Sequence, residues 1–208
     1  MFVDSPKIRS ALRLEIVTIV WMVIEAAVAV GAGIAARSLL LVAFGIDSAI
    51  ELASAVIVFR HFRLQFTEKS ESVLHGADEI ERKAARIAGY LLFLLSAYVF
   101  LQAIFGLTIR HAAETSPIGI AVALIAAFGM PFLAKAKLRV AALIDSRSLR
   151  ADAMETLTCG YLAWILLLGL ALNAVARWWW IDSVASLALV PLLIREGYEA
   201  VSDRGCSA

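Results

Sequence analysis

Six long, predominantly apolar runs dominate this sequence, at about residues 16–36, 39–59, 87–109, 118–134, 153–176 and 179–194. A helix of about 17 to 25 apolar residues is long enough to cross a hydrocarbon layer roughly 30 Å thick. Hydrophobic residues make up 62% of the 208-residue chain, whereas a soluble domain is about 45 to 50% apolar. We therefore expect one all-α membrane domain, residues 1–208, with six transmembrane helices.

The polar segments between these runs indicate how the runs are connected. Arg37 and Ser38 alone separate the first two, which predicts a tight helical hairpin. The charged stretch 60–86 is predicted to be the one substantial loop. Pro117 opens the fourth run at a position where a helix tolerates proline. The segment 135–150 is typical of a helix end followed by a connector at the membrane surface.

Basic residues are distributed unevenly between the two sides that six spans would define. Of the 19 Lys and Arg residues, all but Arg37, Arg110 and Arg177 fall in the segments that share a side with the termini. Because basic loops stay in the cytoplasm, we expect both termini to be cytoplasmic, in a multi-pass protein of the cytoplasmic (inner or plasma) membrane. The formal net charge of +1 gives no reason to expect a nucleic-acid partner.

Four acidic residues lie inside the apolar runs: Glu25, Asp47, Glu51 and Glu155. Each charged group at the centre of a membrane helix opposes insertion by about 2.5 to 3.5 kcal/mol. No Lys or Arg occupies the middle of any run, so ion pairing is not expected to neutralise these acids. The negative charge of these acids must therefore be compensated by protons, water or a bound cation.

The spacing of these acids favours a cation site. Asp47 and Glu51 are four residues apart and so lie on one helix face, and Glu155 and Cys159 repeat that spacing. At about 1.5 Å per residue, Glu51 and Cys159 both fall roughly 13 Å inside the inner edge of the membrane. Two antiparallel helices with two donors each could therefore form a cage of four metal ligands.

Four further side chains, Glu25, His75, Asp152 and Asp182, are considered beside this predicted cage. Glu25 is expected either to face the same cavity, as a proton carrier or extra ligand, or to be a helix-packing contact, and the two alternatives have equal weight. His75 is a possible accessory site where metal first binds, although a solvated side chain is favoured in so charged a stretch. Asp152 and Asp182 lie near the ends of their runs, where water makes a carboxylate inexpensive, so no ligand role is predicted for them.

Three stretches resemble a known family. They are RSLLLVAFGIDSAIELASA (37–55), SLRADAMETLTCGYLAWILLLGL (148–170) and WWWIDSVASLALVPLLIREGYEAV (178–201), and they are similar to the second, fifth and sixth helices of the cation diffusion facilitator (cation efflux) family. The resemblance implies that two acids of helix two, with a His and an Asp of helix five, hold one divalent ion tetrahedrally. Asp47 and Glu51 match the first pair. Glu155 stands where the His belongs, and Cys159 where the Asp belongs.

The resemblance also implies a homodimer. Family members commonly continue into a cytoplasmic domain, whereas this sequence stops at Ala208, so we expect the membrane helices to hold any dimer together. The small residues Ala27, Ala29, Gly31 and Gly33 of the first run would permit close helix approach.

These features predict a secondary transporter that exports a divalent transition metal from the cytoplasm, with protons moving in exchange. Zn²⁺ is the first choice, and Fe²⁺, Co²⁺ or Mn²⁺ are also compatible with the ligand set. No prosthetic group is expected. The chain carries none of the usual hydrolase or phosphate-loop motifs, so an enzyme is not predicted. The alternatives are a metal-independent proton or small-solute carrier, and a non-transporting membrane scaffold or metal sensor.

Overall fold

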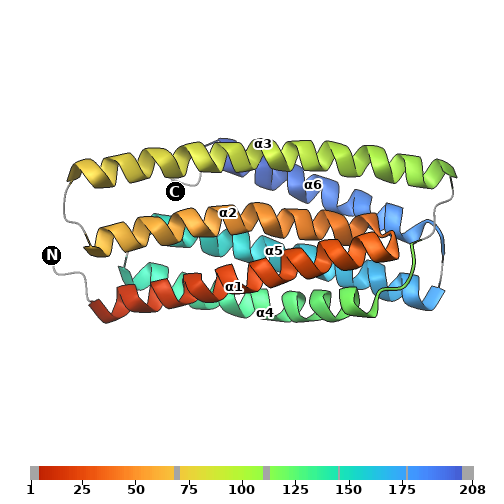
Figure 1. Cartoon of the computed structure of the whole chain (residues 1–208), viewed down its shortest axis with the longest axis horizontal. Helices are drawn as coiled ribbons and strands as arrows, with labels where there is room; N and C mark the ends of the chain where they lie inside the picture. Colours follow the sequence, from red (N-terminus) through yellow and green to blue (C-terminus); the bar gives the residue numbers. More distant parts are fainter. Residues whose placement is uncertain (1–4, 68–70, 110–112, 145, 177, 203–208) are drawn as a thin grey trace.

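The computed structural model of the chain describes residues 5–67, 71–109, 113–144, 146–176 and 178–202. Within these ranges the regular structure is entirely helical, as predicted. The elements are α1 (Ser5–Ala36), α2 (Leu39–Thr67), α3 (Glu71–Ile109), α4 (Pro117–Ile144), α5 (Arg147–Ala176) and α6 (Ile181–Val201). Successive helices run in opposite directions, so α1 begins and α6 ends toward the same end of the bundle (Figure 1). We call this the terminal end.

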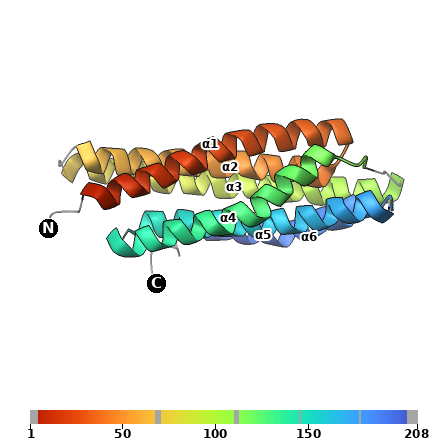
Figure 2. The same ribbon diagram turned by 90° about the horizontal axis from the view of Figure 1, so that it is seen from below.

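Helices α2 and α5 lie at the centre of the arrangement. The most extensive contacts join α1 with α2, α4 with α5, and α3 with α6, while α2 also contacts α3, α5 and α6. The α3–α6 pair runs along one side of the other four helices (Figures 1 and 2). Side chains of α2 and α5 therefore face several helices at once, and this is where polar groups can be enclosed.

Five helices contain stretches long and apolar enough to cross a membrane: Arg9–Ala36, Leu39–Ile57, Gly89–Ile109, Pro117–Ile144 and Asp152–Val175. Large apolar side chains such as Leu94, Phe132 and Val175 point outward, as expected for a surface that contacts lipid. The described part of α6 contains no such stretch, and Arg195, Glu196 and Glu199 lie in its last turns. These charged residues become important below.

The hairpin between α1 and α2 is as tight as predicted. Arg37 adopts a left-handed backbone conformation with φ 52°, and the Ser38 N–H donates to the Gly33 carbonyl at 2.9 Å. A Cβ atom at Gly33 would lie 2.7 Å from Val42 Cγ2, so only glycine permits this approach of the two helices. Ala29 and Gly33 are thus buried within the chain, whereas Ala27 and Gly31 remain exposed.

The prediction of a long loop over 60–86 is wrong. Helix α2 continues to Thr67 and α3 starts at Glu71, so most of this polar stretch is helical. It contains no proline and is rich in Arg, Glu and Lys, which are strong helix formers. The segment 135–150 behaves similarly, because α4 extends to Ile144 and α5 begins at Arg147.

Helix α4 is bent along its length (Figure 2). Pro131 lies inside this helix, and a proline interrupts the backbone hydrogen bonding of the preceding turn. A Cβ atom at Gly160 of α5 would lie 3.0 Å from Pro131 Cδ. The absence of a side chain at Gly160 therefore brings α4 close to α5 next to Cys159.

Candidate metal centre

Asp47 and Glu51 present buried carboxylates from α2. Asp47 is 1% exposed, and Glu51 is only half-buried as a residue, yet its oxygens are enclosed. None of the four carboxylate oxygens has a hydrogen-bond partner among the described residues. Buried polar groups without partners are costly, and buried charges more so. The pair therefore requires protons or a cation from outside the fold.

The second predicted pair lies on α5, opposite these acids. Glu51 is close enough to Glu155 for their charges to interact, and Cys159 lies beside Glu51. Cys159 is fully buried, whereas Glu155 is half-buried. The four predicted ligands are thus neighbours across the α2–α5 interface. We call these four residues the acid centre.

Proximity alone does not make the acid centre a formed metal cage. In the part of the chain that the structure describes, no three His, Cys, Asp or Glu side chains are arranged as a ready-made metal site. Carboxylates repel one another when no cation lies between them. The four-ligand cage therefore remains a prediction.

Glu25 of α1 joins the acid centre. Its carboxylate is fully buried and accepts a hydrogen bond from Ser48 Oγ at 2.8 Å and one from Cys159 Sγ at 3.6 Å. The Trp21 indole N–H also donates to it. Glu25 thus connects α1 to both α2 and α5 and lies within electrostatic range of Asp47. It contacts the centre and packs helices at the same time, so both alternatives given above remain open.

His75 adds nothing to this geometry. Its backbone belongs to α3, but its side chain lies outside the described residues.

Glu196 of α6 is a site residue that the sequence reasoning missed. It is half-buried and interacts electrostatically with Asp47 and Glu155. The sequence placed it in a tail beyond the sixth run. A signal was nevertheless present, because Asp182, Ser186, Leu189 and Leu193 form one buried face of α6, and the same helical spacing continues to Glu196.

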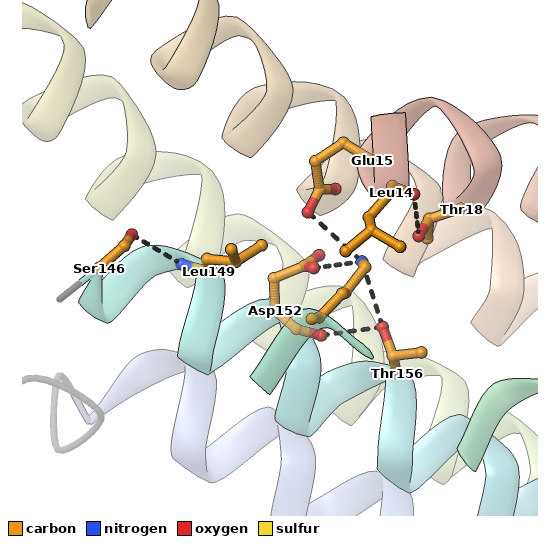
Figure 3. A network of polar contacts seen from close by, with 8 residues as sticks. Leu14, Glu15, Thr18, Ser146, Leu149, Asp152 and Thr156 are labelled. Carbon is orange, nitrogen blue, oxygen red and sulfur yellow. Dashed lines mark hydrogen bonds and ion pairs between the residues drawn. The ribbon is translucent and has the colours of Figure 1, made fainter. Parts of the chain in front are cut away.

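Lys137, predicted to lie in a helix end and connector at the membrane surface, is instead buried inside the bundle. It is 0% exposed, and its Nζ lies 3.5 Å from Glu15 Oε1, pairs with Asp152 Oδ2 and reaches Thr156 Oγ1 at 3.4 Å (Figure 3). Asp152, expected to contact water, is 4% exposed. We call Glu15, Lys137, Asp152 and Thr156 the Lys137 cluster. Lys137 therefore neutralises acids outside the acid centre.

Asp182, also expected to be reached by water, is instead buried and contacts α2. Its carboxylate accepts hydrogen bonds from the backbone N–H groups of Leu39 at 2.9 Å and Leu40 at 3.4 Å, and from Ser38 Oγ. These N–H groups have no partner within the first turn of a helix. Asp182 thus caps α2 and attaches α6 to it.

A helical membrane bundle that encloses unpartnered carboxylates is typical of an ion transporter. The sequence matches the family model of the cation efflux transmembrane domain over residues 16–205. The chain therefore belongs to the cation efflux family, and it is a multi-pass integral membrane protein that transports cations. Members of this family are transporters rather than enzymes and carry divalent cations. A comparison with curated protein sequences finds no match.

Proposed function

We propose that this protein exports a divalent transition metal ion through a site formed by Asp47, Glu51, Glu155 and Cys159. Zn²⁺ is the first choice for this ion. The observation that supports the proposed site most strongly is the pair of buried carboxylates on α2, whose four oxygens have no hydrogen-bond partner in the described ranges. A divalent cation between them would balance two negative charges for which the described residues provide no basic partner.

The donor set suits a borderline-soft metal. Three carboxylates and a thiolate provide four ligands, and Zn²⁺ binds both oxygen and sulfur tetrahedrally. Fe²⁺, Co²⁺ and Mn²⁺ also accept such ligands, with Mn²⁺ depending most on the oxygens. The thiol at Cys159 is therefore the ligand that sets the preference among these ions.

Exchange with protons follows from the same chemistry. Carboxylates and thiolates bind metal only when deprotonated, so protons compete for the ligands. Two protons on Asp47 and Glu51 carry the same charge as one divalent ion, so exchange at these two carboxylates keeps the α2 pair neutral in both states. Glu155 and Cys159 must also give up any proton they hold in order to act as ligands, and they take up protons again when the metal leaves. Metal loaded at the terminal end, taken as cytoplasmic, would thus be released on the other side by protons.

A homodimer is part of the proposal. Ala27 and Gly31 are exposed on the outer face of α1, and no other atom lies within 4 Å of where a Cβ of Gly31 would be. Small exposed residues allow a second helix to approach closely in lipid.

Transport by the purified protein in proteoliposomes tests the proposal. Uptake of Zn²⁺, Fe²⁺, Co²⁺ and Mn²⁺ is measured for the parent and for Asp47→Asn, which keeps the shape of the side chain and removes its charge. We expect Asp47→Asn to lower Zn²⁺ flux by at least about 10- to 100-fold, because replacing even an outer-shell partner of a metal ligand has an effect of that size. Glu114→Gln is the matched control, because Glu114 is an exposed carboxylate at the opposite end from the termini.

Undiminished Zn²⁺ flux in Asp47→Asn would refute the site. Proton flux that needs no metal would favour the carrier alternative. If the parent protein transports none of the four ions, and replacing its buried acids changes only partner binding, the scaffold or sensor alternative is favoured.

A further inference from the structure

The Lys137 cluster contains more acid than its base can neutralise. Glu15 of α1 and Asp152 of α5 both face the single ammonium of Lys137 from α4 (Figure 3). All three side chains are buried, with exposed fractions of 0%, 4% and 0% respectively. With every group ionised, the cluster would hold one uncompensated negative charge, which a buried site tolerates poorly. One bound proton makes the cluster neutral.

The contacts indicate which carboxyl group holds this proton. Asp152 Oδ2 accepts a hydrogen bond from Lys137 Nζ. Glu15 Oε1 lies farther from the same nitrogen, at 3.5 Å, and Glu15 also interacts with the Asp152 carboxyl group. Asp152 is therefore the counter-ion of Lys137, and Glu15 is the surplus acid.

The other charged groups near Glu15 do not compensate for it. Of the described residues, Lys137 from α4 and Asp152 from α5 are the charged groups that interact with it. On α2, Arg60 is exposed. The remaining basic side chains nearby, Arg13, Lys135 and Arg139, are also exposed.

Polar groups continue from this cluster toward the acid centre. Lys137 contacts Thr156, and one turn further along α5, Cys159 contacts Glu25. Glu15 and Glu25 both belong to the buried face of α1 and are separated by about 15 Å along the helix axis. Helix α5 therefore carries both Asp152 and two residues of the acid centre, and α1 carries both Glu15 and Glu25, which contacts Cys159 of that centre.

We propose that Glu15 is a proton-binding site, separate from the metal ligands, that takes up and releases a proton during each transport cycle. This inference rests on the proposed exchange of metal for protons. Glu15 lies toward the terminal end, where it would exchange protons with the compartment from which metal is loaded. If the cluster had only a structural role, Asp152 alone would be enough to pair with Lys137. Replacing Glu15 would then leave proton movement unchanged.

The test measures Zn²⁺ uptake and proton counter-flow together, in proteoliposomes that contain a pH-sensitive dye. Glu15→Gln removes the titratable group and leaves the Lys137–Asp152 pair neutral, so the variant is expected to fold and to bind Zn²⁺ with a Kd within about twofold of the parent. The number of protons moved per Zn²⁺ should fall. The rise of Zn²⁺ flux with pH, up to about tenfold per pH unit for each coupled proton, should become shallower.

If Glu15→Gln accumulates poorly, a second variant, Asp152→Asn, tests the same inference. In Asp152→Asn, Glu15 becomes the counter-ion of Lys137 and can no longer exchange its proton freely, so the same loss of pH dependence is expected. Glu114→Gln should match the parent in every measurement.

A parental ratio of protons to Zn²⁺ and a parental pH profile, in whichever variant folds, would overturn the proposal and leave the cluster with a structural role. The two proposals can fail separately. If Asp47→Asn retains Zn²⁺ flux, the proposed function is refuted. If Zn²⁺ flux is lost in Asp47→Asn but proton coupling is unchanged in Glu15→Gln, only the inference about Glu15 is refuted.

Discussion

Cys159 is the residue whose replacement most directly tests the nature of the transported ion. Its thiol is fully buried, lies beside Glu51 and contacts Glu25 at 3.6 Å. In Cys159→Ser a hydroxyl group can still donate to Glu25, but the soft ligand is lost. We expect the ratio of Mn²⁺ to Zn²⁺ transport to rise about tenfold, because Mn²⁺ prefers oxygen donors. Competitive uptake of the two ions measures this ratio.

The control for this prediction is Thr158→Ser, next to Cys159 on α5, which also changes one side-chain group but leaves the thiol in place. An unchanged ion preference in Cys159→Ser would remove Cys159 from the proposed ligands while leaving the three acids as candidates.

Lys137 is the residue on which the stability of the terminal end should depend most. Lys137→Met leaves the Asp152 carboxylate buried without its counter-charge, and breaking a buried ion pair in this way costs about 3 to 5 kcal/mol. We expect the free energy of unfolding in detergent to fall by an amount of this order. The loss should shrink as the pH is lowered, because protonated carboxyl groups need no counter-charge.

Lys135→Met is the matched control, since Lys135 is exposed and only two residues away. Equal unfolding free energies for the two variants would mean that the Lys137 cluster does not stabilise the bundle.

The residues of the acid centre were predictable and those of the Lys137 cluster were not. The i, i+4 spacing within an apolar run singled out Asp47 and Glu51 with no knowledge of neighbouring helices. Whether Lys137 is buried depends instead on how far α1 and α5 extend beside α4. One clue was present in the chain, because Lys137 continues the buried face formed by Ala123, Ala127, Met130 and Ala134.

At the level of helices, the close packing of α1 and α2 depends on glycine at particular positions. A Cβ atom at Gly33 would lie 2.7 Å from Val42 Cγ2 and 2.8 Å from the Val42 backbone nitrogen, whereas a Cβ atom at Gly31 would meet nothing within 4 Å. We expect Gly33→Ala to destabilise the protein by about 1 to 3 kcal/mol, as overpacking does. Gly31→Ala should be neutral or stabilising by up to about 1 kcal/mol, because alanine favours the helix.

Thermal unfolding of the two variants in the same detergent measures this difference. A Gly33→Ala protein as stable as Gly31→Ala would show that the hairpin can widen at no cost, contrary to the backbone contact described above.

Helix existence was predictable from the sequence, but helix length was not. Apolar runs report where lipid surrounds a helix, and α2 and α3 continue beyond these limits because their charged residues are also good helix formers. The same limitation hid Glu196, which lies past the apolar part of α6 yet approaches Asp47. Hydropathy predicts which residues lie within the membrane. Whether a side chain is buried among helices depends instead on how the helices pack in three dimensions.

For the whole molecule, the remaining expectation is its orientation in the membrane. Helices α1 to α6 alternate in direction, so the described chain has a terminal end and an opposite end that carries Glu114 (Figure 1). The excess of basic residues on the terminal side predicts that this end is cytoplasmic. Metal export requires that orientation, because the ion must bind from the cytoplasm.

Single cysteines introduced at the two ends test this orientation in intact cells. In a background with the two native cysteines replaced by serine, Glu114→Cys should react with a membrane-impermeant thiol reagent added from outside. Glu199→Cys, an exposed position on the last turn of α6, should react only after permeabilisation, because the predicted orientation places this end of the bundle in the cytoplasm. The reverse pattern would invert the bundle and turn the proposed exporter into an importer that binds metal from outside, while the acid centre and its chemistry would stay the same.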